Sequence, residues 1–174
     1  TTEKFHPHAQ ANLCATSGMP GLDGTVRIML GPQEGYFTDQ ALADLCTHIW
    51  QTSAAQDRMG VRLQGASLQH RQGVAADIVS DGIAPGAIQV PASGEPIVLL
   101  ADCQTMGGYT KIATVISADL HKMAHLPAGS KLQFELVTAA QAHAALLDNK
   151  RLFQQWLQGL KPDVPVGWVD EVAL

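Results

Sequence analysis

Short apolar runs, each ended by turn residues such as glycine and proline, constrain the fold of this chain more than any other feature. Runs of this length are typical of strands, and Gly24–Leu30, which stops at Gly31-Pro32, predicts the first of them. Their spacing favours a mainly antiparallel barrel or sandwich over a βαβ sheet. The later runs are Val61–Leu63, Ala75–Val79, Ala87–Val90, Pro96–Ala101, Ile112–Ser117 and Lys131–Val137.

Three segments have helical character, so the predicted fold is mainly β with a few helices. Thr38 is suited to the N-cap of a first helix of about three turns. A short helix is predicted over Leu120–Leu126, and Ala139–Leu160 is rich in strong helix formers, with Asp148-Asn149 as a point where it could divide. The predicted core-facing residues are Ala41, Leu42, Leu45, Ile49 and Trp50 in the first helix, and Ala142, Leu146, Leu147, Phe153, Trp156 and Leu157 in the last.

The pattern predicts one folded domain preceded by a tail. Residues 1–22 show neither helical nor strand period, which is typical of a linker or disordered segment. Residues 23–174 form the predicted domain, and a chain of 174 residues with 46% hydrophobic content can bury roughly two-thirds of its unfolded surface. Because the chain starts without Met, we expect that an upstream segment was removed by truncation or processing.

Composition argues against several kinds of partner and compartment. The net charge of −5 and the absence of a basic run argue against nucleic acid and acidic membrane surfaces. No apolar stretch approaches the roughly twenty residues that span a bilayer, so we expect no membrane insertion. The three cysteines, Cys14, Cys46 and Cys103, form no C-x-x-C pair, and a reducing cytoplasm is the predicted location.

The polar segment Ala101–Lys111 is the strongest candidate for a binding loop. Its polar side chains flank Gly107-Gly108 between two apolar runs, and a Gly-Gly turn would let a ligand approach backbone N–H groups closely. The alternative is a polar hairpin in which Asp102 and Thr105 satisfy backbone donors. Residue types alone leave both interpretations open.

Two further polar residues lie next to apolar runs. The Arg58 guanidinium suits a carboxylate or a phosphate, but a structural ion pair with Asp57 or another acid is the usual role of such an arginine. Gln89 interrupts an apolar strand, and its side chain points either into a pocket or outward to solvent.

No metal site and no nucleophilic triad is predicted. His121 and His125 are four residues apart, but no Glu or Cys completes a ligand set, so solvated histidines are the better interpretation. Cys103 would be a nucleophile only with a histidine near it in space, and a half-buried structural cysteine is the alternative. The chain contains neither a phosphate-binding P-loop nor a G-x-S-x-G elbow.

Four motifs in a specific order carry a family resemblance. They are Gly31-Pro32-Gln33, DRMGVRL at 57–63, SDG with GAIQVP within 80–91, and PIVLLADCQTMGGYTKIA at 96–113. In this order they resemble the C-terminal half of the allophanate hydrolase subunit 2 family, the biotin-dependent carboxyltransferase-like proteins that include the 5-oxoprolinase C subunits. The resemblance covers about Val26 to Val137.

The resemblance implies a cyclophilin-like β-barrel, one of two in a full-length member, which pairs with a subunit 1-type partner. It implies a subunit or fragment of an enzyme that acts on a small amide or lactam. Such an enzyme is either an ATP-dependent 5-oxoprolinase or the carboxyltransferase part of a urea carboxylase, which uses carboxybiotin. The alternative is a non-catalytic regulatory module that binds a kinase-inhibitor-like partner. Peptidyl-prolyl isomerase activity ranks last, because a fold alone does not carry a function.

Carried over to this chain, the resemblance implies a composite site completed by the other barrel or the partner subunit, so we expect the isolated chain to be inactive. Neither biotin nor ATP is assigned to this chain alone. Cys103 and Thr110 depart from the family pattern, which has a basic residue and proline there, and they bear on the substrate more than on the fold. The expected catalytic residues are Asp102, Lys111 and Tyr109, and the expected substrate-binding residues are Gln104, Thr105, Gly107, Gly108, Arg58 and Gln89.

Overall fold

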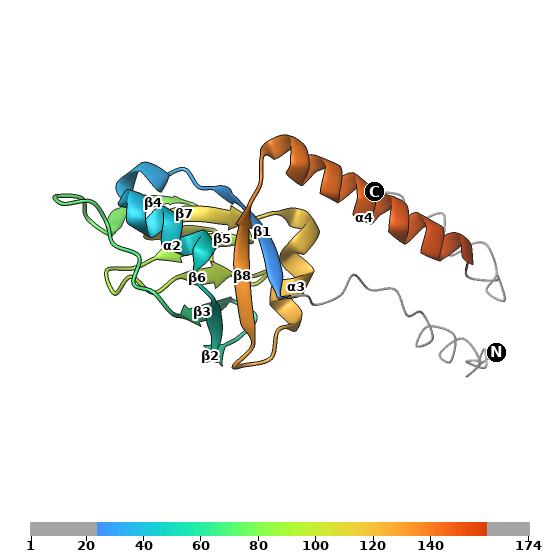
Figure 1. Ribbon diagram of the computed structural model, residues 1–174, viewed down its shortest axis with the longest axis horizontal. Helices are drawn as coiled ribbons and strands as arrows, with labels where there is room; N and C mark the ends of the chain where they lie inside the picture. Colours follow the sequence, from blue (N-terminus) through green and yellow to red (C-terminus); the bar gives the residue numbers. More distant parts are fainter. Residues whose placement is uncertain (1–23, 160–174) are drawn as a thin grey trace, which may run out of the picture. The chain divides into compact units, whose positions relative to one another are not determined.

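The structure is a computed structural model that describes residues 24–159, and it is mainly β (Figure 1). Residues 24–149 form one compact unit, and residues 150–159 belong to a second unit. The described strands are β1 (Thr25–Leu30), β2 (Trp50–Gln56), β3 (Gly60–Gln64), β4 (Asp77–Gly82), β5 (Ala87–Val90), β6 (Ile97–Leu99), β7 (Met106–Val115) and β8 (Lys131–Leu136).

Seven of these strands close into a barrel in the order β1-β8-β2-β3-β6-β5-β7. The barrel closes where β1 pairs antiparallel with β7, with Ile28 opposite Val115. β1 pairs with β8 in parallel, and the other pairs in the barrel are antiparallel. Among the described strands β4 pairs only with β7, so it lies outside the closed ring. The prediction of a mainly β barrel is therefore confirmed.

The barrel interior is filled by the inward-facing residues of alternating strands. Val26 and Ile28 of β1 are buried while their neighbours are less so, as the two-residue period of a strand requires. Trp50 is fully buried, and its indole Nε1 donates to the carbonyl of Leu45 at 2.9 Å, which satisfies the polar end of a large apolar side chain. Other core residues are Phe37, Val61, Leu63, Leu68, Ile88, Val98, Ile112, Met123, Leu132 and Phe134.

α2 (Asp39–Thr47) begins at the predicted N-cap. The Thr38 hydroxyl accepts a hydrogen bond from the Ala41 N–H at 3.1 Å, and the helix buries Ala41 and Leu45. The predicted apolar face is wrong at its end, because Ile49 is exposed and Trp50 already belongs to β2. Pairing of β2 with β8 takes the chain into extended structure two residues beyond the last helical turn.

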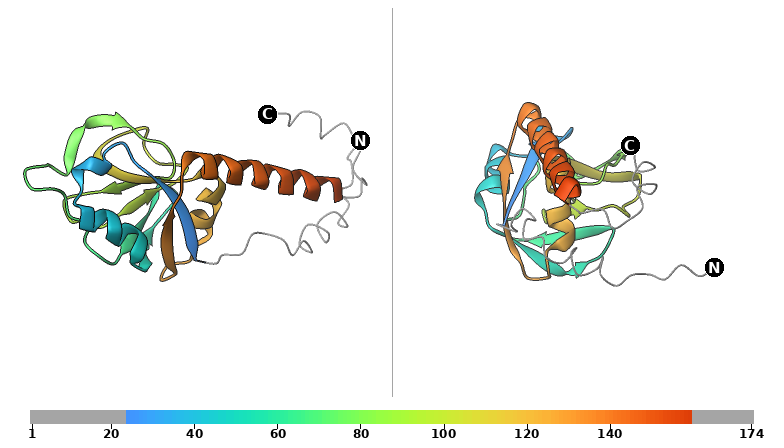
Figure 2. Two further views of the ribbon diagram at one scale, coloured as in Figure 1. Left: turned by 45° about the horizontal axis from the view of Figure 1, so that its top comes forward. Right: turned by 90° about the vertical axis from the view of Figure 1, so that its right-hand side faces the viewer.

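α3 (Leu120–His125) is the predicted short helix, and it follows the 3₁₀ turn η2 (Ser117–Asp119). The Asp119 carboxylate accepts hydrogen bonds from the Arg27 N–H, Nε and Nη2 at 2.9, 2.9 and 2.7 Å. Lys122 lies 3.7 Å from the same carboxylate. These contacts attach the start of α3 to β1, beside which it lies in Figures 1 and 2.

α4 (Ala139–Gly159) is one continuous helix, so the possible division at Asp148-Asn149 does not occur. Thr138 and Gln141 cap its start reciprocally: the Thr138 N–H donates to the Gln141 side chain at 2.8 Å, and the Gln141 N–H donates to Thr138 Oγ1 at 3.3 Å. The predicted core-facing stripe is wrong in most positions. Ala145 is buried and Ala142 and Trp156 are partly buried, but the larger members Leu146, Leu147, Phe153 and Leu157 are exposed.

Two features of the strands differ from the sequence pattern. β2 was not predicted because WQTSAAQ is mostly polar or small, and it forms because β3 and β8 pair with it on either side. Gly107 and Gly108 are not a turn; they lie inside β7, and neither has a positive φ. Pairing with β4, which places Asp81 opposite Gly107, extends β7 back to Met106.

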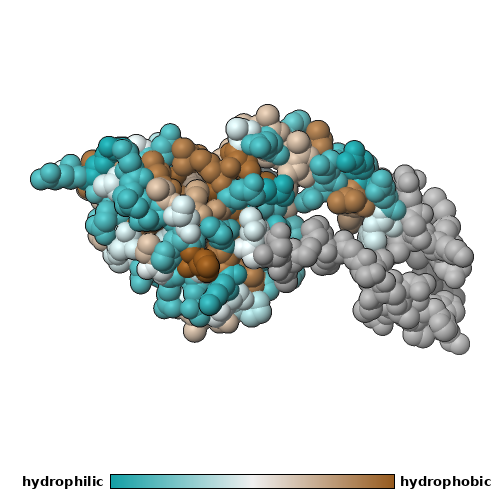
Figure 3. Space-filling model, in the orientation of Figure 1, coloured by the Kyte–Doolittle hydropathy of each residue, from teal (hydrophilic) through white to brown (hydrophobic). Residues whose placement is uncertain are grey.

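The described surface is mixed, with hydrophobic groups among hydrophilic ones over the visible barrel face (Figure 3). Large exposed apolar residues of the barrel include Val79, Met106, Leu30 and Leu136. Over residues 24–159, no helix is both long enough and apolar enough to cross a membrane.

Candidate functional site

Three of the expected site residues fall into two ion-paired groups. Lys111 of β7 pairs with Asp81 of β4, and Asp102 pairs with Arg58. Asp102 and Lys111 therefore belong to different ion pairs.

Lys111 is nearly enclosed. Its side chain is 5% exposed, and Nζ donates to Asp81 Oδ2 at 2.6 Å and to the Gly82 carbonyl at 2.9 Å. A buried ammonium group costs free energy unless it is paired and hydrogen-bonded, and these two acceptors meet that requirement. The Asp81 side chain is 53% exposed, so the pair is buried on the lysine side and open to water on the carboxylate side.

The turn Gly31-Pro32-Gln33 holds the backbone of Lys111. The Gln33 N–H donates to the Lys111 carbonyl at 3.3 Å, and the Gln33 side-chain oxygen accepts from the Lys111 N–H at 3.1 Å. The turn passes so close to β7 that a Cβ on Gly31 would overlap the Lys111 carbonyl oxygen. Glycine at position 31 is therefore required for this close approach.

The Asp81 carboxylate is stabilised in its charged form. The hydrogen bond from Lys111 holds the pKa of Asp81 below its usual range, with further contributions from the Gly82 N–H, the Lys111 charge and the Gln33 side chain. The Gly82 N–H donates to Asp81 Oδ1 at 2.7 Å. Asp81 is thus an anion at neutral pH and a weak base, which suits it to holding Lys111 rather than to removing a proton from a substrate.

Gln89 of β5 lies beside Lys111. The two residues are opposite each other in the β5–β7 pair, so their side chains share one face of the sheet. Gln89 is 2% exposed, and its Nε2 has no hydrogen-bond partner among the described residues. Of the two orientations that the sequence left open, the solvent-facing one is wrong. An unpaired buried N–H is costly and uncommon, which marks this donor as a candidate ligand contact.

Gly107 makes room for this arrangement. A Cβ at Gly107 would come within 3.0 Å of Gln89 Nε2 and would overlap the Cδ1 atom of Ile83. Asp81 is opposite Gly107 in the β4–β7 pair, so Gln89, Lys111 and Asp81 all lie around this glycine. The glycine thus serves close packing within a strand and not the predicted turn.

Thr110 faces the opposite side of β7 from Lys111, where it meets His70. The Thr110 hydroxyl donates to the Val90 carbonyl at 3.2 Å and lies 2.8 Å from His70 Nε2. The Thr110 hydroxyl therefore links His70 of the 65–76 segment to the backbone of β5. The ring also packs on Phe37 with centroids 4.4 Å apart, and burial lowers the pKa of His70.

The remaining expected residues of the 101–111 segment lie at the surface. Asp102, Gln104, Thr105 and Tyr109 are exposed, and Cys103 is partly buried. The Thr105 carbonyl accepts from the Ile83 N–H at 2.9 Å, so part of its role is structural. Among residues 24–159, the side chains of Gln104 and Tyr109 make no hydrogen bond with another described residue.

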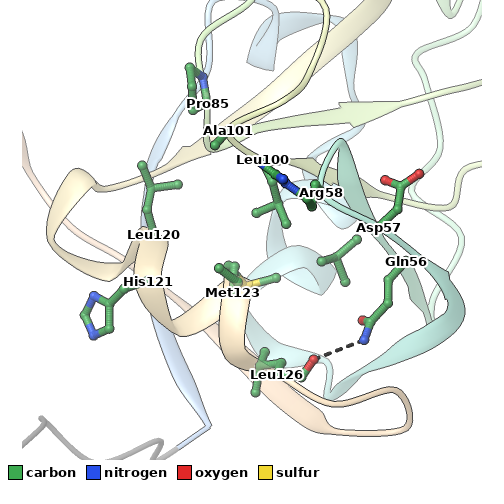
Figure 4. A pocket seen from close by; sticks show the side chains of 12 residues that line it. Gln56, Asp57, Arg58, Pro85, Leu100, Ala101, Leu120, His121, Met123 and Leu126 are labelled. Atoms are coloured by element: carbon green, nitrogen blue, oxygen red, sulfur yellow. Dashed lines mark hydrogen bonds between the residues drawn. The ribbon is translucent and has the colours of Figure 1, made fainter. Parts of the chain in front are cut away.

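The second group lies at a cavity of about 520 Å³ (Figure 4). Arg58 and Asp102 meet in a two-point ion pair, with Nε–Oδ2 at 2.8 Å and Nη2–Oδ1 at 3.3 Å. Arg58 is 86% exposed, so this pair contributes little stability. The cavity walls are mainly apolar, with the side chains of Leu100, Leu120, Met123 and Leu126 around the space and Gln56 bonded to the Leu126 carbonyl at 3.2 Å.

His121 and His125 do not form a metal site with each other. His125 Nδ1 contacts the His121 carbonyl at 2.6 Å, as expected within one helical turn. Over residues 24–159, no group of three His, Cys, Asp or Glu side chains is placed to hold a metal ion.

The barrel, with its GPQ turn and Lys111 cluster on β7, lies in a part of the chain that matches a known family. The carboxyltransferase domain family, subdomains A and B, matches residues 3–136. The chain belongs to this family. The resemblance inferred from the four motifs is thus confirmed for the carboxyltransferase family.

Two curated relatives of this carboxyltransferase-family chain are 5-oxoprolinase C subunits. The Escherichia coli protein is 37% identical over 130 residues, which cover 75% of this chain and 41% of the relative. The Haemophilus influenzae protein is 46% identical over 93 residues, which cover 53% of this chain and 29% of the relative. The matched part therefore spans less than half the length of either relative.

A solved structure has the same fold at lower sequence identity. The crystal structure of the K. lactis urea amidolyase superposes with a TM-score of 0.70 at 21% identity, and the match covers 76% of this chain and 8% of that protein. This likeness supports the barrel architecture, and at this identity it is used for the fold alone.

Three residues of the candidate site were not among the expected ones. Gln33 and Asp81 lie in the motifs that carried the resemblance, so their segments were recognised but their side chains were not assigned. His70 lies in the 65–76 segment, which has no motif, and only the fold brings it to Thr110. Gln33 and Asp81 could have been found from the sequence, because each is a polar residue inside a glycine-containing motif.

Proposed function

We propose that this chain is one barrel of an enzyme of the 5-oxoprolinase or urea carboxylase type, acting on a small amide or lactam. Lys111 supplies positive charge to a carbonyl oxygen of the substrate as negative charge develops on it. The observation that carries the proposal is the enclosed Lys111 ammonium, 5% exposed and fixed by Asp81 and Gly82. The identity to two 5-oxoprolinase C subunits supports the reaction class.

A fixed cation in a water-poor site stabilises an oxyanion more than an exposed one does, because less solvent screens its charge. Gln33 fixes the Lys111 backbone and Asp81 fixes its Nζ, so little reorganisation is needed when charge develops. Gln89 adds a neutral N–H donor that has no partner among the described residues. One cationic and one neutral donor side by side suit a carboxylate or a carbonyl oxygen.

Tyr109 remains a candidate from its position two residues before Lys111, on an exposed part of β7. Asp102 has less support as a catalytic base, because its carboxylate is engaged by Arg58. We assign that pair to the cavity rim and to the orientation of the 101–105 turn. Gln104 and Thr105 stay substrate-binding candidates that depend on what completes the site.

The rest of the active site comes from outside this chain. The relatives are more than twice as long as the matched part, so the proposal places a second barrel and a subunit 1-type partner around the Lys111 cluster. Carboxybiotin or ATP, where the full complex uses one, is assigned to those other parts and not to residues 24–159. On this proposal the isolated chain has no activity.

The test is turnover by the full-length protein co-expressed with its genomic neighbours. ATP-dependent cleavage of 5-oxoproline is assayed beside carboxylation of urea and related amides with carboxybiotin. Lys111→Ala should lower kcat/KM by about 10²- to 10³-fold, the size of effect seen when one oxyanion donor is removed. Lys131→Ala is the matched control, because Lys131 is an exposed residue at the start of β8, and this variant should keep full activity.

Lys111→Met is tested in parallel, because an apolar side chain of similar length keeps the packing. It leaves Asp81 able to reach water, so the free energy of unfolding should change by no more than about 1–2 kcal/mol. Full activity of either Lys111 variant in an intact complex would contradict the catalytic role. A stable complex without turnover of any substrate would favour the regulatory module.

A further inference from the structure

The β4 segment lies outside the closed barrel and supplies the acceptors that enclose the Lys111 ammonium group. β4 pairs only with β7 among the described strands, and the register of that pair shifts between Asp77 and Asp81. In Figures 1 and 2, β4 lies on the outside of the barrel next to the first half of β7. Val79 in the middle of β4 is 93% exposed, so its side chain packs on almost nothing.

The inward contacts of this segment fall on the proposed site. Asp81 and the Gly82 carbonyl take the two hydrogen bonds of Lys111 Nζ. Ile83, which follows β4, packs so closely on Gly107 that no Cβ fits between them, and the same glycine borders Gln89 Nε2. The segment thus neutralises one donor with a carboxylate and places the Ile83 side chain beside the glycine that borders the other.

We propose that residues 77–83 form a strap that is closed in this structure and that must lift before a substrate oxygen can reach Lys111 and Gln89. In the closed state, the Asp81 carboxylate then occupies the position on Lys111 that an anionic or carbonyl oxygen of the substrate would take. The inference rests on the proposed function, because it takes Lys111 and Gln89 to be the ligand contacts. It adds that access to them is controlled by a segment of the same chain.

Two observations support an opening that leaves the barrel intact. The strap is an edge strand attached to β7 in a two-stranded ribbon, and such ribbons are marginally stable without further packing. Opening must break the backbone hydrogen bonds that hold its two ends, from the Ile83 N–H to the Thr105 carbonyl at 2.9 Å and from the Thr110 N–H to the Ala76 carbonyl at 3.1 Å. The unpaired Gln89 N–H gains a partner only when the strap moves, which offsets part of the cost of opening.

The test measures opening directly and needs no turnover. Amide hydrogen exchange of the full-length protein is followed at Ile83 and Thr110, with Val98 of β6 as the probe of the barrel core. The Ile83 and Thr110 amides, which bond the two ends of the strap to β7 and its preceding turn, are called the strap amides. Their exchange should be at least about tenfold faster than exchange at Val98, as expected for a local opening. Ile83→Ala should accelerate them by about tenfold more and leave Val98 unchanged.

Val79→Ala is the matched control, because it removes a β-branched side chain from the same segment but loses no contact. It should leave the exchange rates at Ile83 and Thr110 within about twofold of the unmodified protein. Equal acceleration by Val79→Ala and Ile83→Ala would overturn the proposal, since the effect would then come from strand propensity. Strap amides that exchange only together with Val98 would also overturn it.

A second readout follows the Lys111 amine by acylation with N-acetoxysuccinimide and mass spectrometry. Lys131 on exposed β8 serves as the internal reference. Lys111 should react at least about tenfold more slowly than Lys131, and Ile83→Ala should narrow that difference, because labelling follows the open population. Equal rates for the two lysines in the unmodified protein would show that no closed strap exists.

These outcomes are independent of catalysis. If the strap opens as expected while the Lys111→Ala variant keeps full turnover, that result would support the gate and contradict the catalytic role of Lys111. Loss of turnover in Lys111→Ala, together with a strap that does not open, would support the catalytic role of Lys111 and overturn the gate.

Discussion

Arg27 and Asp119, 92 residues apart in the chain, are joined by three hydrogen bonds of 2.7 to 2.9 Å. Asp119 is 1% exposed. Burial alone would raise the pKa of its carboxyl, but the Arg27 hydrogen bonds and the charges of Lys122 and Arg27 outweigh it and hold the pKa below its usual range. This contact ties η2 and α3 to β1, the strand that closes the barrel on β7.

Replacing Asp119 should therefore destabilise the fold. Asp119→Ala leaves the Arg27 guanidinium and N–H without this acceptor, and the free energy of unfolding should fall by about 2–4 kcal/mol in urea titrations. Asp39→Ala is the control, because Asp39 pairs with Arg71 at 2.7 Å on the exposed surface and should contribute no more than about 1 kcal/mol. Equal losses for the two variants would show that burial of the ion pair has no special weight.

Stability should also depend on pH through His70. Burial lowers its pKa in the folded state, while the unfolded chain retains a value of about 6.5. The unfolded state therefore binds more protons just below pH 6.5, so stability is fully present above that pH and declines as the pH falls toward the folded pKa.

The variant His70→Gln should flatten this decline, because its amide can still form a hydrogen bond with Thr110 but does not titrate. Urea unfolding between about pH 7.5 and 5.5 measures the slope. His143→Gln on the exposed surface of α4 is the control and should retain the slope of the unmodified protein. A slope unchanged by His70→Gln would show that other groups cause the decline.

The packing around Gly107 predicts a steric effect of a single methyl group. Gly107→Ala places a Cβ against Ile83 and within 3.0 Å of Gln89 Nε2, and should cost about 1–3 kcal/mol of stability as overpacking does. Gly82→Ala, in the paired strand β4, adds a Cβ that meets nothing within 4 Å and should have little effect.

A double-variant cycle tests the cause of the Gly107→Ala effect. Ile83→Ala removes the atom with which the new Cβ collides, so Gly107→Ala should cost less in that background than alone. Additive costs would mean that the collision with Ile83 is not the source, and that a direct contact with Gln89 or a change in strand conformation is.

Much of the secondary structure follows from local sequence. The N-cap at Thr38, the run that becomes β1 and the short α3 helix depend on residues close together in the chain, and all three occur as predicted. The motif Gly31-Pro32-Gln33 was likewise recognised before its role was known. Local propensity and turn chemistry act over a few residues, so a single sequence reveals them.

The arrangement of the site was decided by tertiary structure. Gly107-Gly108 is a typical turn signal, but pairing with β4 places both residues in a strand. The same pairing brings Asp81 to Lys111. The long apolar residues of α4 have helical period, yet they are exposed in the structure.

The sequence by itself therefore determined the family, the β character of the chain and the segments that carry its polar residues. Only the fold decided which of those side chains meet. Strand pairing and the burial of a charge depend on contacts between residues that are far apart in the chain, and the free energy of such contacts outweighs local preference.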